Sequence, residues 1–126
     1  MRTGGAILLL AFVLGAAIAD VRAGEADVVA AEAHKAPDGS WTFEVTVRHA
    51  DEGWHHYADA WEVRALDGAL LARRILLHPH VGEQPFTRSL AGVRLPPGTR
   101  RVRIRAHDSV HGYGGRELEL LLPQDP

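Results

Sequence analysis

The sequence predicts an all-β fold: a single antiparallel β-sandwich of seven strands, of the immunoglobulin or fibronectin type III kind. Three observations support this. Apolar and polar residues alternate through most of the chain after its N-terminal segment, turn-forming residues recur at short intervals, and no later segment shows the apolar repeat of a helix. A jelly roll or a cupredoxin-like sandwich of seven or eight strands is the alternative architecture.

The N-terminal segment has the layout of a secretory signal peptide. Arg2 precedes the uncharged apolar run AILLLAFVLGAAIA, which at about 14 residues is too short to span a bilayer as a helix. Small residues then offer cleavage after Ala19 or Ala23. We expect residues 1–23 to be the signal peptide and residues 24–126 the sandwich domain, located in the periplasm or secreted, without a stable membrane anchor. An uncleaved anchor is the alternative.

The first three strands are expected from the alternation of their side chains. Residues 27–35 (DVVAAEAHK) alternate weakly, and the turn sequence APDGS separates them from residues 40–49 (SWTFEVTVRH). The second segment alternates strictly, with Trp41 on its apolar side. The third segment, residues 57–66 (YADAWEVRAL), places Trp61 where sandwich folds often bury a tryptophan.

The other four strands are expected between turn residues. The pair Asp67–Gly68 is a strong hairpin signal and leads into residues 69–78 (ALLARRILLH). Residues 86–93 (FTRSLAGV) follow a loop, and the turn sequence LPPGT separates them from residues 101–108 (RVRIRAHD). Residues 116–122 (RELELLL) complete the set. Seven short strands at fairly even spacing favour a sandwich.

Composition argues against several classes of function. The chain contains no cysteine, which removes thiolate chemistry, disulfides, the usual blue-copper centre and lipid modification of a cysteine. The net charge is −2, and loss of residues 1–23 would make it −3; this near-neutral balance argues against a nucleic-acid partner. The sequence shows no nucleophile elbow, phosphate loop or dinucleotide fingerprint. We therefore expect a non-catalytic domain.

Histidines are concentrated in one set of loops. If the strands run up and down in order, the loops at residues 50–56, 79–85 and 109–115 meet at one end of the sandwich, which we call the histidine pole. Seven of the eight histidines lie in these loops or within two residues of them, and His34 is the exception. Loops on a rigid scaffold commonly carry binding residues, so the functional site is expected here.

The sequence HPH at residues 78–80 predicts a metal site at the histidine pole. His78 and His80 are two residues apart in an extended segment, so their side chains leave on the same side. Zinc or copper usually takes three or four ligands, and either ion suits imidazole and carboxylate without sulfur. The alternative is a hydrogen-bonded network without metal, in which His78, Asp108 and His111 hold the three loops together.

Further ligands are expected from the other two loops. His111, in a glycine-rich loop, is the best third ligand, and His56 is a fourth candidate. Strand phase points His49, Asp59 and Asp108 inward near the pole, and an inward carboxylate can orient a metal-binding imidazole. The expected ligands of copper or zinc are His78, His80, His111 and His56, supported by Asp108, Asp59 and Glu83.

The alternative function for the same loops is recognition of a partner. Trp54, in the loop before the third strand, is expected to contact a ligand or a partner, or alternatively to cover the end of the core. In this interpretation the domain is a non-catalytic protein-interaction or assembly module with a protein partner in the periplasm.

The blocks GWHHYADAW, LLHPHVGEQPFTRSL and HDSVHGYGG resemble those of a group of small exported bacterial proteins with no assigned activity. The resemblance extends from about Trp41 to Leu122 and implies an exported protein but no mechanism. The stretch LPPGTRRVRIRAHDSVHGYGG also resembles the sixth strand and following loop of a fibronectin type III domain, although no tyrosine stands at Arg100 or Arg101. The positions that match the blocks of the group include Trp54, Tyr57, Asp59, Trp61, His78, His80, Glu83, Gln84, Asp108, His111 and Gly112.

Overall fold

A computed structural model describes residues 24–124, which form seven strands and no helix. The expected signal peptide lies outside the described residues. No helix with the length and apolar character to cross a membrane occurs in the described part of the chain. The strands are β1 (Asp27–Lys35), β2 (Trp41–Arg48), β3 (Ala58–Arg64), β4 (Leu70–Ile75), β5 (Phe86–Val93), β6 (Arg101–Asp108) and β7 (Leu118–Leu121).

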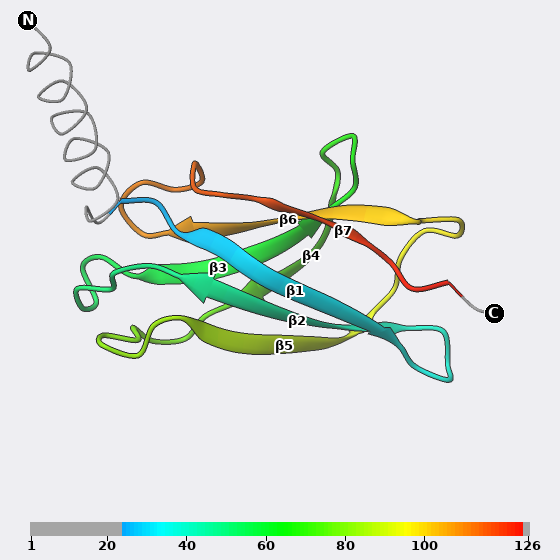
Figure 1. The fold of residues 1–126 in the computed structure, drawn as a ribbon, viewed down its shortest axis with the longest axis horizontal. Coiled ribbons are helices and arrows are strands. Elements are labelled where there is room, and N and C mark those ends of the chain that lie inside the picture. Colours follow the sequence, from blue (N-terminus) through cyan, green and yellow to red (C-terminus); the bar gives the residue numbers. More distant parts are fainter. Residues whose placement is uncertain (1–23, 125–126) are drawn as a thin grey trace, which may run out of the picture.

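The strands form two antiparallel sheets that lie one behind the other in Figure 1. One sheet has the order β1–β2–β5 and the other the order β4–β3–β6–β7. Every paired strand runs antiparallel to its neighbour. The prediction of seven strands in an all-β, antiparallel arrangement is confirmed.

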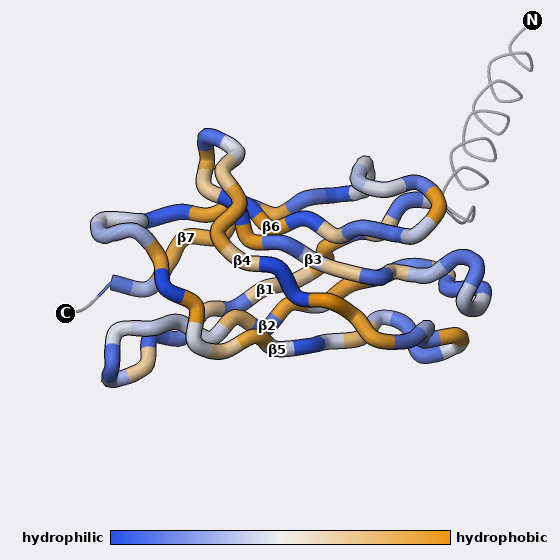
Figure 2. The backbone as a smooth tube through the Cα atoms, turned by 180° about the vertical axis from the view of Figure 1, so that it is seen from behind, coloured by the Kyte–Doolittle hydropathy of each residue, from blue (hydrophilic) through white to orange (hydrophobic). Residues whose placement is uncertain are grey.

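The core lies between the sheets and follows the alternation of the sequence. Phe43, Val45 and Val47 of β2 face Trp61 of β3 and Ile104 of β6 across this core, and all five are fully buried. Figure 2 shows the apolar positions recurring along the strands between polar ones. Each such side chain stabilises the fold by about 1.5–3 kcal/mol relative to its exposed state. The expected burial of Trp61 is confirmed.

The three loops of the histidine pole meet at the end of the sandwich where β1 begins (Figure 1). Hydrogen bonds join them directly. The backbone N–H of Ser109 donates to the carbonyl of Tyr57 at 2.9 Å, and the backbone N–H of His80 donates to Oδ2 of Asp51 at 2.8 Å. The predicted convergence of these loops is therefore confirmed.

Asp59 departs from the prediction because of a bulge in β3. The register of β3 against β6 shifts between Ala58 and Ala60, which changes the face that residue 59 occupies. Its carboxylate lies on the outer face of the sheet and bonds Nδ1 of His107. The expectation that Asp59 points inward to support a metal site is therefore wrong.

The outer face of β3 also carries a buried carboxylate. Glu62 is fully buried beneath its neighbours and bonds the hydroxyl of Tyr113 and three guanidinium groups. Burial alone would raise the pKa of Glu62, but the hydrogen bonds outweigh it and lower the pKa to about 2. The guanidinium partners are Arg64, Arg73 and Arg105.

Candidate metal centre at the histidine pole

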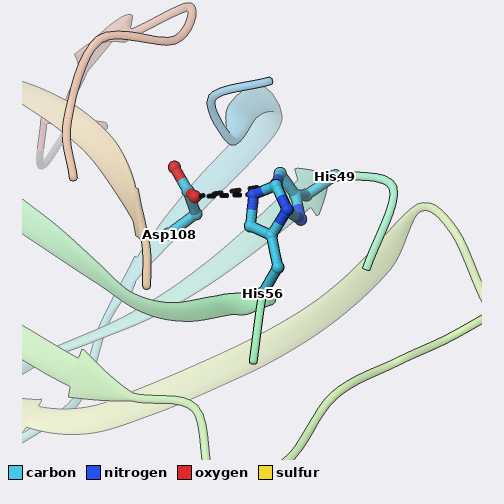
Figure 3. Close-up of side chains that lie close together, drawn as sticks. All are labelled: His49, His56 and Asp108. Carbon is cyan, nitrogen blue, oxygen red and sulfur yellow. Dashed lines mark hydrogen bonds and ion pairs between the residues drawn. The ribbon is translucent and has the colours of Figure 1, made fainter. Parts of the chain in front are cut away.

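The inward stripes of two core strands end in polar side chains at the histidine pole. The buried face of β2 continues one position beyond the strand to His49, and the buried face of β6 ends in Asp108. His56, from the loop before β3, completes the group (Figure 3). One ligand atom from each of the three residues lies within 4.8 Å of the others, and all three are buried.

Asp108 is a buried carboxylate with its two oxygens in different surroundings. Its Oδ2 accepts hydrogen bonds from the backbone N–H of Val110 at 3.1 Å and of His111 at 3.0 Å, and it also contacts ring nitrogens of His56 and His111. Its Oδ1 is buried and has no hydrogen-bond partner among the described residues. Burial alone would raise the pKa of Asp108, but the bonds to its carboxylate lower it. The group is therefore an anion with one oxygen still able to accept.

Both buried imidazoles carry a carboxylate on Nδ1 and have Nε2 near Asp108. Nδ1 of His56 lies 2.5 Å from Oε1 of Glu52, and Nδ1 of His49 lies 2.6 Å from Oδ1 of Asp51. Nε2 of His56 lies 3.0 Å from Oδ2 of Asp108 and that of His49 lies 3.9 Å from it; dashed lines mark these contacts in Figure 3. A carboxylate on Nδ1 fixes the tautomer of a metal-binding histidine and leaves Nε2 to face the ion.

The Nε2 atoms of both buried imidazoles already have hydrogen-bond partners. Nε2 of His49 donates to the backbone carbonyl of Gly24 at 2.8 Å, and Nε2 of His56 points at Asp108. Burial lowers the pKa of His56, but hydrogen bonds and charge from Glu52 and Asp108 outweigh it, so the pKa is raised overall. A bound metal would replace these hydrogens, so protons and metal compete for one place.

His111 forms the solvent side of the group. Its Nδ1 lies 3.1 Å from Oδ2 of Asp108, and its ring centre lies 5.0 Å from that of His56. Its side chain is 37% exposed, whereas those of His49 and Asp108 are inaccessible. The structure thus brings together the predicted residues His56, His111 and Asp108, with His111 on the exposed side of the group.

The other two predicted ligands lie outside this group. Nε2 of His80 accepts a hydrogen bond from Nη2 of Arg88 at 2.7 Å, and a guanidinium on one nitrogen disfavours a second cation there. The exposed His78 stacks beside His80, with 4.6 Å between ring centres. Glu83, predicted as a supporting residue, is exposed and donates its backbone N–H to the carbonyl of His80. Within residues 24–124, His78, His80 and His111 do not form a three-ligand group.

The sequence reasoning missed the two acids that orient the imidazoles. Asp51 also accepts hydrogen bonds from the backbone N–H groups of Ala58 and His80, so it ties three segments together. The available signal was spacing: His49 is followed by Asp51 after one residue, and Glu52 precedes His56 by four.

Trp54 does not cover the core. Its side chain is 68% exposed and packs edge-on against Tyr57, with 5.6 Å between ring centres. Val81 and Val110 of the pole are exposed with it, as is Leu77 just before the loop at residues 79–85.

Comparison with known proteins assigns no ligand to this site. No protein-family model matches the chain, and no solved structure matches it. A protein of Halomicrobium mukohataei named "Putative lipoprotein" is 45% identical over 94 residues, which cover 75% of this chain and 46% of that protein. The chain therefore spans less than half the length of this relative, whose name states no ligand or activity.

Proposed function

We propose that the domain binds a divalent transition metal, zinc or copper, through His49, His56 and Asp108, with His111 as the ligand on the solvent side. The observation that carries this proposal is the convergence of two buried imidazoles on one buried carboxylate. Each has a carboxylate on Nδ1. Nε2 of His56 bonds Oδ2 of Asp108 at 3.0 Å, and Nε2 of His49 lies 3.9 Å from the same oxygen and would leave the carbonyl of Gly24 to bind the ion. Nitrogen and oxygen ligands without sulfur suit both ions.

The charge around the two imidazoles supports a cation. Three carboxylates, those of Asp51, Glu52 and Asp108, surround them. The proposal keeps His56, His111 and Asp108 from the set expected from sequence and replaces the pair His78 and His80 with His49.

We further infer an exported, non-catalytic domain of fibronectin type III kind that does not bind nucleic acid. β4 pairs with β3 and not with the β1–β2–β5 sheet, which differs from the constant-type immunoglobulin order. The name of the Halomicrobium relative supports export. The absence of cysteine from this chain leaves no thiol for lipid attachment within it.

Titration of the metal-free protein with Zn²⁺ and Cu²⁺ by calorimetry tests the proposal. One ion should bind per chain. His56→Ala should abolish tight binding, and Glu52→Gln should weaken it by about 10–100-fold because it removes only the orienting carboxylate. His34→Ala, an exposed histidine on β1, is the matched control and should bind like the unaltered protein. Equal affinity of the unaltered protein and a folded His56→Ala would contradict the proposal.

A second candidate function is recognition of a protein partner. Each loop of the histidine pole exposes one large apolar side chain, Trp54 at 68%, Val81 at 59% and Val110 at 56%. Aromatic residues of this kind often dominate binding energy at interfaces. A complex isolated under native conditions should be lost with Trp54→Ser and kept with Leu121→Ser, which alters an exposed apolar residue of β7. Loss with neither variant would argue against this surface.

A further inference from the structure

The residues of the HPH sequence line a small cavity away from the metal group. The cavity measures about 70 Å³ and lies where β4 and β5, the edge strands of the two sheets, approach each other. Nε of Arg74 on β4 donates to the carbonyl of Ser89 on β5 at 2.9 Å and so bridges the two sheets. Its lining residues are Arg74, Leu76, Leu77, His78, His80 and Arg88.

The two arginines of this cavity have no carboxylate partner among residues 24–124. Of the partly buried arginines in the described chain, Arg64 and Arg105 share the carboxylate of Glu62, whereas Arg74 and Arg88 pair with no carboxylate there. The hydrogen bonds of Arg74 and Arg88 to the protein go to backbone carbonyls and to His80. These bonds hold the guanidinium groups in place but leave their charge uncompensated.

His80 adds a buried donor to this positive surface. Because a guanidinium only donates, the 2.7 Å contact with Arg88 makes Nε2 of His80 the acceptor, and the neutral ring then carries its hydrogen on Nδ1. His80 is only 3% exposed, and its Nδ1 has no partner among the described residues. A buried N–H without an acceptor is costly and indicates a missing partner.

We propose that this cavity binds a small oxyanion, such as phosphate, sulfate or a carboxylate, held by Arg74, Arg88 and the ring of His80. His78 lies at the rim beside His80 and can donate once protonated. Leu76 and Leu77 form an apolar wall that limits the ligand to a compact group.

Acidic groups near the cavity do not neutralise it. Asp51 is the nearest buried acid, but its oxygens accept from His49, Ala58 and the backbone of His80. Glu83 is exposed on the same loop and makes no side-chain hydrogen bond or ion pair within the described chain. Burial is the main cause that lowers the pKa of His80; the charges of Arg88 and His78 add to it and those of Asp51 and Glu83 oppose it.

The oxyanion proposal is independent of the proposed metal site, because Arg74, Arg88 and His80 do not belong to the group of His49, His56 and Asp108. NMR titration of the protein, held metal-free by a chelator, with sodium phosphate tests it. The ring resonances of His78 and His80 should shift in a saturable manner, and sodium chloride at equal ionic strength should not reproduce the shift. Separate titrations with sulfate and acetate identify the class of oxyanion, and binding of any of the three supports the site.

Variants make the test specific. Arg88→Gln should weaken binding by about tenfold or more, because it removes a charge-assisted donor. Arg74→Gln should do the same and serves if Arg88→Gln does not fold. Arg94→Gln, at an exposed arginine paired with Asp38, should bind like the unaltered protein. Shifts that chloride reproduces, or unchanged affinity in the folded Arg88→Gln or Arg74→Gln variant, would overturn the proposal.

Discussion

Nε2 of His56 lies 3.0 Å from Oδ2 of Asp108, although 52 residues separate the two in the sequence. The contact joins the loop before β3 to the end of β6 inside a water-poor site, since both residues are buried. The hydrogen that Nε2 donates to Asp108 lies between the two atoms, and a metal ion bound by both would have to displace it. The chemistry of the histidine pole depends on whether the hydrogen or a metal ion lies there.

The first prediction is that metal affinity falls as the pH is lowered. The fall should begin at a higher pH than for a site whose histidines have ordinary pKa values. The pKa of His56 is raised from 6.5, so the competing proton is held more tightly than on a free imidazole. Calorimetric titration with Zn²⁺ between about pH 8 and about pH 6 measures this.

Glu52→Gln provides the control for this pH dependence. The hydrogen bond that His56 donates to Glu52 is the largest of the contributions that raise the pKa of His56, so its loss should move the decline in affinity to lower pH. An affinity that does not vary with pH in either protein would contradict metal binding through this imidazole.

The second prediction concerns the metal-free protein, whose stability should decline on both sides of mildly acidic pH. Because the folded pKa of His56 is raised, its contribution is complete below pH 6.5 and is lost as pH rises through the folded value. Because the folded pKa of Asp108 is lowered, its contribution is present above pH 3.8 and is lost as pH falls through its folded value. Urea unfolding across this range should show a maximum that His56→Gln flattens on its alkaline side.

Alternation predicted the part of the site that belongs to strands. The inward positions of His49 and Asp108 follow from continuing the buried faces of β2 and β6 to their ends. The convergence of the loops followed from connecting antiparallel strands in order. These features depend on local backbone geometry, which a sequence records directly.

Features set by distant partners could not be predicted in this way. His78 and His80 have suitable spacing for a metal, but Arg88, from the following strand, already donates to His80. Asp59 has the phase of an inward residue, but a bulge at its own position turns it outward. Glu62 occupies the outward phase that indicates exposure, yet long arginine side chains from β3, β4 and β6 cover it.

The third prediction is that Glu62→Gln destabilises the fold by roughly 2–3 kcal/mol, below the usual cost of breaking a buried ion pair because the arginine partners are partly exposed. The neutral amide leaves the guanidinium groups of Arg64, Arg73 and Arg105 together without a carboxylate. The contribution of Glu62 to stability should be present above pH 4.5 and lost as pH falls toward about 2.

The control for this prediction is Glu119→Gln, which alters an exposed ion pair with Arg101 and should cost about 0–1 kcal/mol. Equal costs in urea unfolding would contradict the burial of Glu62.

The fourth prediction is that Gly115→Ala is among the most damaging substitutions in the chain, with a cost of about 3 kcal/mol or more from overpacking. A Cβ at Gly115 would lie 2.0 Å from the backbone oxygen of Ala26 and 2.7 Å from Oδ1 of Asp27. This close approach lets the backbone of Arg116 pair with β1. The N–H of Val28 donates to the carbonyl of Arg116 at 2.9 Å, and the N–H of Arg116 donates to Oδ1 of Asp27 at 2.6 Å.

Gly24→Ala is the matched control, because a Cβ there meets no atom within 4 Å. It should unfold in urea like the unaltered protein, whereas Gly115→Ala should lower the midpoint and release the β1 edge first. Hydrogen exchange at the N–H of Val28 reports this release, since that hydrogen bond crosses from one sheet to the segment leading into the other. Unchanged protection of Val28 in Gly115→Ala would show that the backbone can relax around the methyl group. The hydrogen bond between Val28 of β1 and Arg116 would then not require a glycine at position 115.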